Sequence, residues 1–238
     1  GADWKTEAFR QGKDMYKVQA EAIYHIPYDS VDKAQRQVGK VGELGCGYGA
    51  GPVALQRFAG KMGIEMDEEA ALDLVRSWRG TNPEVVDLWD RLNTGLHSAV
   101  TLNAVIEIPL ANGLKLRFVP FTPPQSLATQ HPGAVSIKME LWGEGGTDFV
   151  LERVFHGCYM RGDDVCFYKP SDRKTGDLWR NHYRDPKTGK TVFYKLYGGK
   201  ITGILTQSFC RELFFDAAIL LEENFSMATT KAQLIGQF

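Results

Sequence analysis

The sequence predicts an α+β protein, with a helical N-terminal part, an antiparallel β-rich middle segment and a long C-terminal helix. Apolar residues recur at helical spacing through the first hundred residues. From 101 to 200 the pattern changes to short β runs separated by Gly, Pro and Asn. Helical spacing returns after Gly198 and Gly199. We therefore expect three parts, 1–100, 101–200 and 201–238.

The first two predicted helices lie on either side of a proline. Apolar residues from Met15 to Ile23 lie three or four positions apart, which predicts a helix that ends before Pro27. Ser30 is the predicted N-cap of the second helix. Alternate glycines begin at Gly45, and we expect them to break this helix.

Three further helices are predicted from their termini and periodicity. One covers Asp67–Trp78, because acidic residues in its first turn suit the helix dipole. Another runs from Pro83 to about Ala99, with the proline at its first position. The last covers Ile201 to about Glu223, where apolar residues again recur at helical spacing.

The middle segment contains candidate strands at Val105–Ile108 and Lys115–Val119. Its final part, 161–200, contains ten Lys or Arg residues against five Asp, interleaved with Tyr, Phe and Trp. Positive charge alternating with aromatic rings is typical of a surface that follows a nucleic-acid backbone. A solvated hairpin with a half-buried aromatic face gives the same pattern, so both interpretations stay open.

Composition excludes several classes of protein. The 238 residues are 43% hydrophobic and 24% charged, which is typical of a globular domain and not of a disordered chain. The formal net charge of -1 indicates no general affinity for polyanions, so contact with nucleic acid would need a local patch. No apolar run approaches the roughly 18 residues of a membrane span, so we expect a cytoplasmic protein with no membrane partner.

The glycine-rich segment after residue 42 has two interpretations. In the first, Glu43–Gly49 resembles the glycine-rich loop of S-adenosylmethionine-dependent methyltransferases. This alternative also places a helix at Pro52–Ala59 and a strand at Met62–Asp67. A loop of this kind follows a buried parallel strand, but the residues before it include only two apolar side chains, Val38 and Val41.

In the second interpretation the residues before the glycines are helical. Arg36, Lys40 and Leu44 then lie four residues apart on one stripe, with Tyr48 beyond it. Two cations one turn apart suit a polyphosphate, because each donates charge-assisted hydrogen bonds to phosphate oxygens. The same spacing is also typical of the solvated face of a surface helix.

The pattern Arg36-x3-Lys40-x3-Leu44-x3-Tyr48-Gly49 resembles motif B, the nucleotide-binding helix in the fingers of family A DNA polymerases. Further segments resemble the bacteriophage-type branch of this family, in the same order along the chain. They are Asp14-Met-Tyr16, Tyr24–Gln37, Trp78–Leu92 and Tyr197–Glu223. The resemblance covers roughly residues 2 to 223 and implies a fragment of the fingers and part of the palm.

The resemblance also implies roles for single residues. Arg36 and Lys40 would bind the triphosphate of the incoming nucleotide, and Lys40 would be the catalytic proton donor to the pyrophosphate leaving group. Tyr16 would reach the phosphates from the preceding helix, and Leu44 would pack against the sugar and base. The expected nucleic-acid contacts are Tyr48 and Gly49 beside the template base and Gln207 in the duplex minor groove.

Family A polymerases hold two Mg²⁺ ions with carboxylates from two palm motifs, and we find neither motif in this sequence. Asp3–Phe9 resembles the segment immediately after the first motif, and the residues after Asn224 resemble nothing in the family. We therefore expect no metal bound by this fragment, Mg²⁺ in the complete parent enzyme, and weak binding of a dNTP and primer–template DNA without polymerisation. A non-enzymatic prophage remnant is a further alternative.

Overall fold

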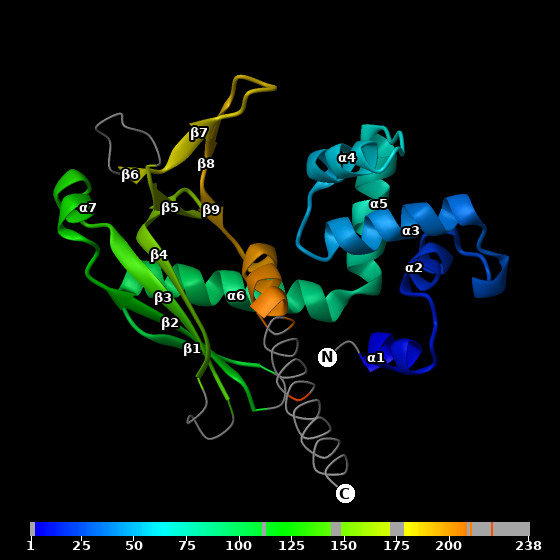
Figure 1. The fold of residues 1–238 in the computed structure, drawn as a ribbon, viewed down its shortest axis with the longest axis horizontal. Helices are drawn as coiled ribbons and strands as arrows, with labels where there is room; N and C mark the ends of the chain where they lie inside the picture. The colour runs from blue at the N-terminus through cyan, green and yellow to red at the C-terminus, as the bar shows by residue number, and fades with distance from the viewer. Residues whose placement is uncertain are drawn as a thin grey trace, which may run out of the picture. The chain divides into compact units, whose positions relative to one another are not determined.

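The computed structural model describes residues 3–110, 113–143, 149–171, 179–208, 210 and 220. They form helices and antiparallel strands, which confirms the predicted α+β class. The chain divides into two compact units, Gly1–Thr202 and Gly203–Phe238, and each is described by itself. The first unit includes both the helical part and the β-rich segment (Figure 1).

Among the described residues, seven helical elements precede the sheet: α1 (Asp3–Arg10), α2 (Met15–Tyr24), the 3₁₀ turn η1 (Tyr28–Ser30), α3 (Lys33–Cys46), α4 (Pro52–Lys61), α5 (Glu68–Thr81) and α6 (Pro83–Leu102). The helices predicted before Pro27, at Asp67–Trp78 and at Pro83–Ala99 are therefore confirmed. The strand that the methyltransferase alternative places at Met62–Asp67 is wrong, because those residues form a turn and irregular backbone. Its helix at Pro52–Ala59 corresponds to α4.

The predicted N-cap of α3 was wrong by two residues. Ser30 lies in the 3₁₀ turn, and Asp32 is the N-cap. The Asp32 carboxylate accepts a hydrogen bond from the Gln35 backbone N–H at 2.8 Å, and the Gln35 side-chain oxygen accepts one from the Asp32 N–H at 3.0 Å. This reciprocal capping box satisfies two backbone donors, so it is a stronger start signal than a serine alone.

Helix α3 ends at Cys46, within the run of alternate glycines that was predicted to break it, although Gly45 itself is still helical. Gly39, Gly42 and Gly45 are buried and recur every three residues along the helix. A Cβ at Gly39 would lie 2.1 Å from the Tyr16 carbonyl oxygen, and one at Gly45 would lie 2.3 Å from Leu55 Cδ1. These glycines therefore let α3 pack closely against α2 and α4.

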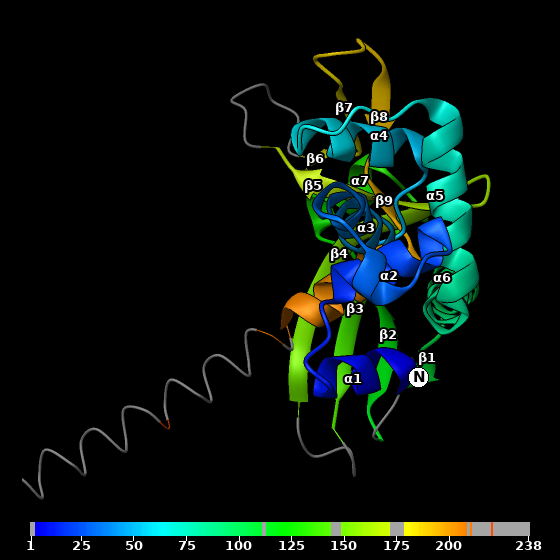
Figure 2. The ribbon, with the colours of Figure 1, turned by 90° about the vertical axis from the view of Figure 1, so that its right-hand side faces the viewer.

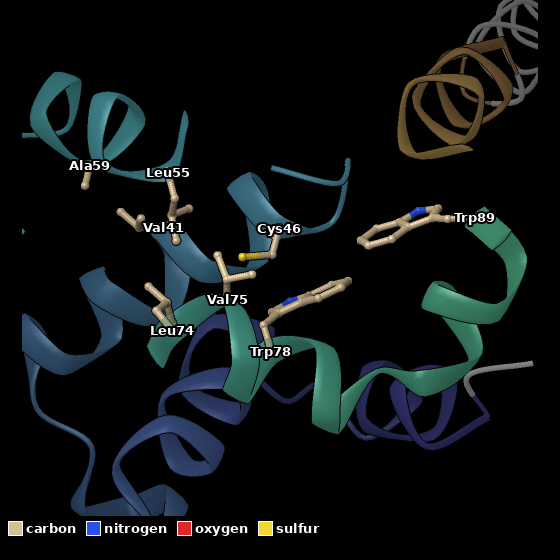
Figure 3. Close-up of a cluster of buried hydrophobic side chains, with 8 residues drawn as sticks. All are labelled: Val41, Cys46, Leu55, Ala59, Leu74, Val75, Trp78 and Trp89. Carbon is tan, nitrogen blue, oxygen red and sulfur yellow. The ribbon is translucent and has the colours of Figure 1, made fainter. Parts of the chain in front are cut away.

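The core of the helical part surrounds the second half of α3 (Figure 3). Trp78 from α5 and Trp89 from α6 stack with ring centroids 5.7 Å apart and planes 10° apart. Because Trp89 lies in the first half of α6, this stack ties the helix that reaches the sheet to the helical core. The remaining buried members of the cluster are Val41, Cys46, Leu55, Ala59, Leu74 and Val75.

The sheet is an antiparallel meander in the order β1-β2-β3-β4-β5-β6, with β9 also pairing with β5. Its strands are β1 (Ile106–Pro109), β2 (Lys115–Phe121), β3 (Val135–Trp142), β4 (Phe149–Arg161), β5 (Asp164–Pro170), β6 (Trp179–Arg180) and β9 (Lys195–Leu196). The two strands predicted from the sequence correspond to β1 and β2. A short helix, α7 (Gln125–Gln130), joins β2 to β3, and β7 (His182–Arg184) pairs with β8 (Thr191–Phe193) in a separate hairpin.

Helix α6 lies along the sheet, as both ribbon views show (Figures 1 and 2). Gly95 is a point of close approach, since a Cβ there would lie 2.4 Å from Ile108 Cδ1 of β1. One continuous helix thus contributes Trp89 to the helical core and Gly95 to the sheet contact. The helical and β-rich segments are joined in one unit for this reason.

The last described helix covers 198–208, so it begins three residues before the predicted Ile201. Residues 210 and 220 are also helical. The rest of the predicted helix to Glu223, and the tail 224–238, lie outside the described residues. Among the helices that the structure describes, none is long and apolar enough to cross a membrane.

Candidate functional site

Two cations of α3 lie against one aromatic ring of α2. The Arg36 guanidinium carbon is 5.1 Å from the centre of the Tyr16 ring, and the Lys40 ammonium is 5.7 Å from it. All three side chains are half-buried. Because the cations are one turn apart, they lie on the same side of the helix, and both are within cation–π distance of this ring. The structure therefore brings together three of the predicted site residues.

Asp14 holds the position of Arg36. Its carboxylate accepts a hydrogen bond from Arg36 Nε at 2.5 Å and one from the Tyr16 backbone N–H at 2.9 Å, which caps α2. Burial by itself would raise the pKa of the Asp14 carboxyl, but the hydrogen bonds from Arg36 and Tyr16 and the charge of Arg36 outweigh it and lower the pKa. Arg36 thus already has an anionic partner within the protein.

Leu44 and Tyr48 continue along the exposed side of α3. Leu44 is one turn beyond Lys40 and 39% exposed, and Tyr48 follows the end of the helix and is 43% exposed. Neither makes a described contact with Arg36 or Lys40. Their exposure leaves both side chains accessible to a ligand that lies along the helix.

The backbone at Tyr48 and Gly49 packs against the glycine pair Gly198 and Gly199, which in the sequence marks only the start of the last helix. Gly49 has a φ of 80°, which favours glycine. A Cβ at Gly199 would lie 2.5 Å from the Tyr48 carbonyl oxygen, and one at Gly198 would lie 2.2 Å from the Trp89 carbonyl oxygen. The chain leaving the sheet therefore packs directly against the end of α3 and against α6.

Glu43 connects α3 to α1 and α5. Its carboxylate forms an ion pair with Lys5 and accepts a hydrogen bond from Trp78 Nε1 at 3.0 Å. The Lys5 ammonium also lies 5.2 Å from the Trp78 ring. In the sequence, Glu43 stands only as the first residue of a glycine-rich segment, and spacing alone gives no signal for these long-range partners.

Two other residues do not join this site. Gln207 is exposed on the helix 198–208 and belongs to the second unit, so the α3 site is described without it. Cys46 is buried, and burial raises the pKa of its thiol to about 12, so it is an unreactive core residue.

The described residues do not fit a magnesium site. Within the ranges given above, no group of three or more His, Cys, Asp or Glu side chains could hold a metal ion. The acidic residues near the α3 site are Asp14 and Glu43, and each is paired with a cation. We therefore assign no step to a metal ion here.

The helical conformation of α3 bears on the methyltransferase alternative. A cofactor-binding glycine loop of that class follows a parallel strand. Residues 33–46 are helical instead, and every strand pairing that the structure describes is antiparallel.

Comparison with known proteins gives one partial similarity. No family model matches the chain. Over 91 residues, 37% of the chain, the sequence is 33% identical to a DNA polymerase of Bacillus phage SP02. The match spans only 14% of the length of that polymerase. The chain is thus related to a phage DNA polymerase over part of its length.

Proposed function

We propose that this chain is a fingers and partial palm fragment of a family A DNA polymerase of the bacteriophage type, and that α3 binds the incoming nucleotide. The observation that carries the proposal is the convergence of Arg36, Lys40 and Tyr16 on one side of α3. The similarity to a phage DNA polymerase supports it independently. DNA and nucleotides are the corresponding partners.

The two cations have different roles in this proposal. Arg36, which Asp14 holds in place, donates hydrogen bonds to phosphate oxygens of the dNTP. Lys40 has no carboxylate partner among the described residues, so its ammonium is available to the triphosphate and as proton donor to the pyrophosphate leaving group. Both charges stabilise negative charge that develops during phosphoryl transfer.

The remaining predicted contacts follow the exposed side of the site. Leu44 packs against the sugar and base of the nucleotide, and Tyr48 with Gly49 lies beside the template base. Tyr16 contacts the phosphates from α2. Gln207, in the second unit, is a separate proposed contact with the minor groove of the primer–template duplex.

Isothermal titration with a dNTP tests the nucleotide site. We expect weak binding, and replacing either Arg36 or Lys40 by Ala should cost about 1–3 kcal/mol, because each substitution removes a charge-assisted hydrogen bond to phosphate. The matched control is Lys61→Ala, which removes an exposed lysine at the end of α4. Equal affinity of the wild type and Lys40→Ala for the dNTP would contradict the proposal.

The same titration separates the alternatives. Saturable binding of S-adenosylmethionine with no binding of a dNTP would favour the methyltransferase. Binding of neither ligand by the folded protein would favour a non-enzymatic remnant.

Primer extension tests the expected lack of activity. We expect the 238-residue chain alone to incorporate no nucleotide in the presence of Mg²⁺, because it contains no counterpart of the two carboxylate motifs. Templated incorporation by the purified chain would show that other carboxylates serve as ligands.

A further inference from the structure

Five side chains from β5, the β7–β8 hairpin and the segment after β9 form a group of aromatic rings and cations. We call it the Phe167 cluster, and it consists of Phe167, Lys169, Tyr183, Tyr194 and Lys200. All five residues lie within the first unit, away from the α3 cations in sequence. The α3 site makes no use of them.

The rings of the cluster form a row that ends at the surface. Phe167 and Tyr194 have ring centroids 6.0 Å apart, and Tyr194 and Tyr183 are stacked with centroids 5.8 Å apart and planes 25° apart. Phe167 is buried, Tyr194 is half-buried and Tyr183 is 43% exposed. Tyr183 therefore extends an existing aromatic stack into solvent (Figure 1 shows the β7–β8 hairpin).

Two ammonium groups lie over these rings. Lys169 Nζ is 4.7 Å from the Tyr194 centroid and 5.9 Å from that of Phe167. Lys200 Nζ is 5.0 Å from the Phe167 centroid and donates a hydrogen bond to the Lys195 carbonyl oxygen at 3.0 Å. Burial lowers the pKa of Lys200, and the charge of Lys169 lowers it further. The two cations are thus close enough to repel each other.

Two neighbouring cations have carboxylate partners. Lys195 pairs with Asp164 at 2.5 Å, and Arg57 of α4 pairs with Asp185 of the hairpin at 3.9 Å. Within the part of the chain that the structure describes, neither Lys169 nor Lys200 is within ion-pair distance of a carboxylate. An external anion bound between them would relieve their mutual repulsion.

A single strand of nucleic acid has the chemistry that fits this cluster. Its unpaired bases offer faces that stack on tyrosine, and its phosphates carry the anionic charge. In a duplex the base faces are already stacked on each other, so Tyr183 would have none to contact. A free phosphate would satisfy the lysines but would leave the ring row unused.

We propose that the Phe167 cluster is a binding site for single-stranded DNA, in which a base stacks on Tyr183 and a backbone phosphate lies between Lys169 and Lys200. This goes beyond the nucleotide site on α3, although it rests on DNA being a partner of the chain. It also selects one of the two interpretations of the basic, aromatic segment 161–200.

Fluorescence anisotropy of the whole 238-residue chain with a labelled oligothymidylate tests the site. Tyr183→Leu should weaken binding at least about fivefold by loss of stacking. Lys169→Ala should weaken it by a similar factor and reduce the salt slope of the binding constant by about 0.7, because one phosphate contact is lost. Both residues are exposed, so neither substitution removes a buried side chain.

Lys187→Ala is the matched control, since it removes an exposed lysine from the turn of the same hairpin and outside the cluster. It should leave the affinity within twofold of the wild type. Unchanged affinity of Tyr183→Leu and Lys169→Ala, or an equal loss in Lys187→Ala, would overturn the proposal. The proposal would also be overturned if inorganic phosphate, at matched ionic strength, displaced the labelled oligonucleotide as well as unlabelled oligothymidylate does. That result would show a site for anions only.

The dNTP titration of the same variants distinguishes this proposal from the proposed function. If Lys169→Ala loses oligonucleotide binding and keeps its dNTP affinity, the cluster is a separate site. If oligonucleotide binding depends on Lys40 and not on Lys169, the single strand binds at α3 and the cluster proposal fails. If the chain binds the oligonucleotide through Tyr183 but binds no dNTP, the proposed nucleotide site on α3 is contradicted and the cluster proposal stands.

Discussion

The α3 site and the Phe167 cluster both place two cations against aromatic rings, but they differ in what balances the charge. At α3, Arg36 is paired with Asp14 at 2.5 Å. In the cluster, Lys169 and Lys200 have no carboxylate partner among the residues that the structure describes. An internal carboxylate fixes the geometry of a cation before a ligand arrives and also competes with the ligand for it. The cluster should therefore depend more strongly on an external anion.

The two sites also differ in how they are assembled. The α3 site depends on close packing of two helices, through glycines that admit backbone contacts. The cluster depends on a hairpin, with the cations on β5 and after β9. A change in helix packing should thus disturb the first site far more than the second.

The largest expected effect comes from Gly39→Ala. The new Cβ would lie 2.1 Å from the Tyr16 carbonyl oxygen, so α2 and α3 must separate, at a cost of about 3 kcal/mol in the free energy of unfolding. Urea denaturation measures this cost. Gly60→Ala in α4 is the control, because a Cβ there meets nothing within 4 Å and should stabilise the helix by about 0.5–1 kcal/mol. Equal stability of the two variants would contradict the close packing of α2 and α3.

An intermediate effect is expected when the variants of each site are measured with the ligands of both sites. Lys40→Ala should lose dNTP affinity about tenfold and keep oligonucleotide affinity within about twofold, and Lys169→Ala should do the reverse, because a lost phosphate contact weakens only the ligand that makes it. Titration calorimetry and anisotropy on the same preparations give both numbers. Parallel losses in both assays would mean that the two sites bind one ligand jointly.

The smallest expected effect concerns the Asp14 carboxylate. The pKa of this carboxyl is lower in the folded protein than in the unfolded chain. The ion pair therefore stabilises the fold fully when the pH is above the pKa of the unfolded state. This stabilisation is lost as the pH falls through the pKa of the folded state. Asp14→Asn should therefore cost under about 1 kcal/mol at pH 7, since the pair is partly exposed. The difference from wild type should shrink as the pH falls below 3.8, the ordinary Asp value.

Thermal unfolding as a function of pH measures that difference. Asp90→Asn is the control, because Asp90 is an exposed carboxylate on α6. A difference between Asp14→Asn and wild type that stays constant down to acid pH would exclude the ion pair as its cause.

The helix boundaries show which features of the fold periodicity and capping rules predict from the sequence. Apolar spacing predicted α2, because a helix that buries one face leaves its period in the sequence. Acidic residues in the first turn predicted α5, and a proline at the first position predicted α6. The predicted N-cap of α3 was wrong because Ser30 and Asp32 are both residue types that favour an N-cap. The capping box with Gln35 favours Asp32.

The glycines within α3 and the glycines after it have different roles. Glycine costs helix stability in isolation, so alternate glycines predict a break. Here Gly39, Gly42 and Gly45 face α2, α5 and α4 in turn, and close packing against those helices outweighs the local cost. Spacing separates the two kinds: Gly39 and Gly42 lie one turn apart on one face of the helix, which suits close packing, whereas the alternate glycines after Gly45 suit a helix end.

Some features of the candidate sites depend on residues that are near in sequence, and others depend on contacts between distant residues. The sequence by itself determined the class of fold, the helical stripe of Arg36, Lys40 and Leu44, and the charge of segment 161–200, because these depend on residues near one another in the chain. Only the tertiary structure decided that Tyr16 meets both α3 cations, that Asp14 holds Arg36, and that Lys200 joins Lys169 over Phe167. Those contacts join residues 20 to 33 positions apart, and packing between elements, which local periodicity does not encode, brings them together.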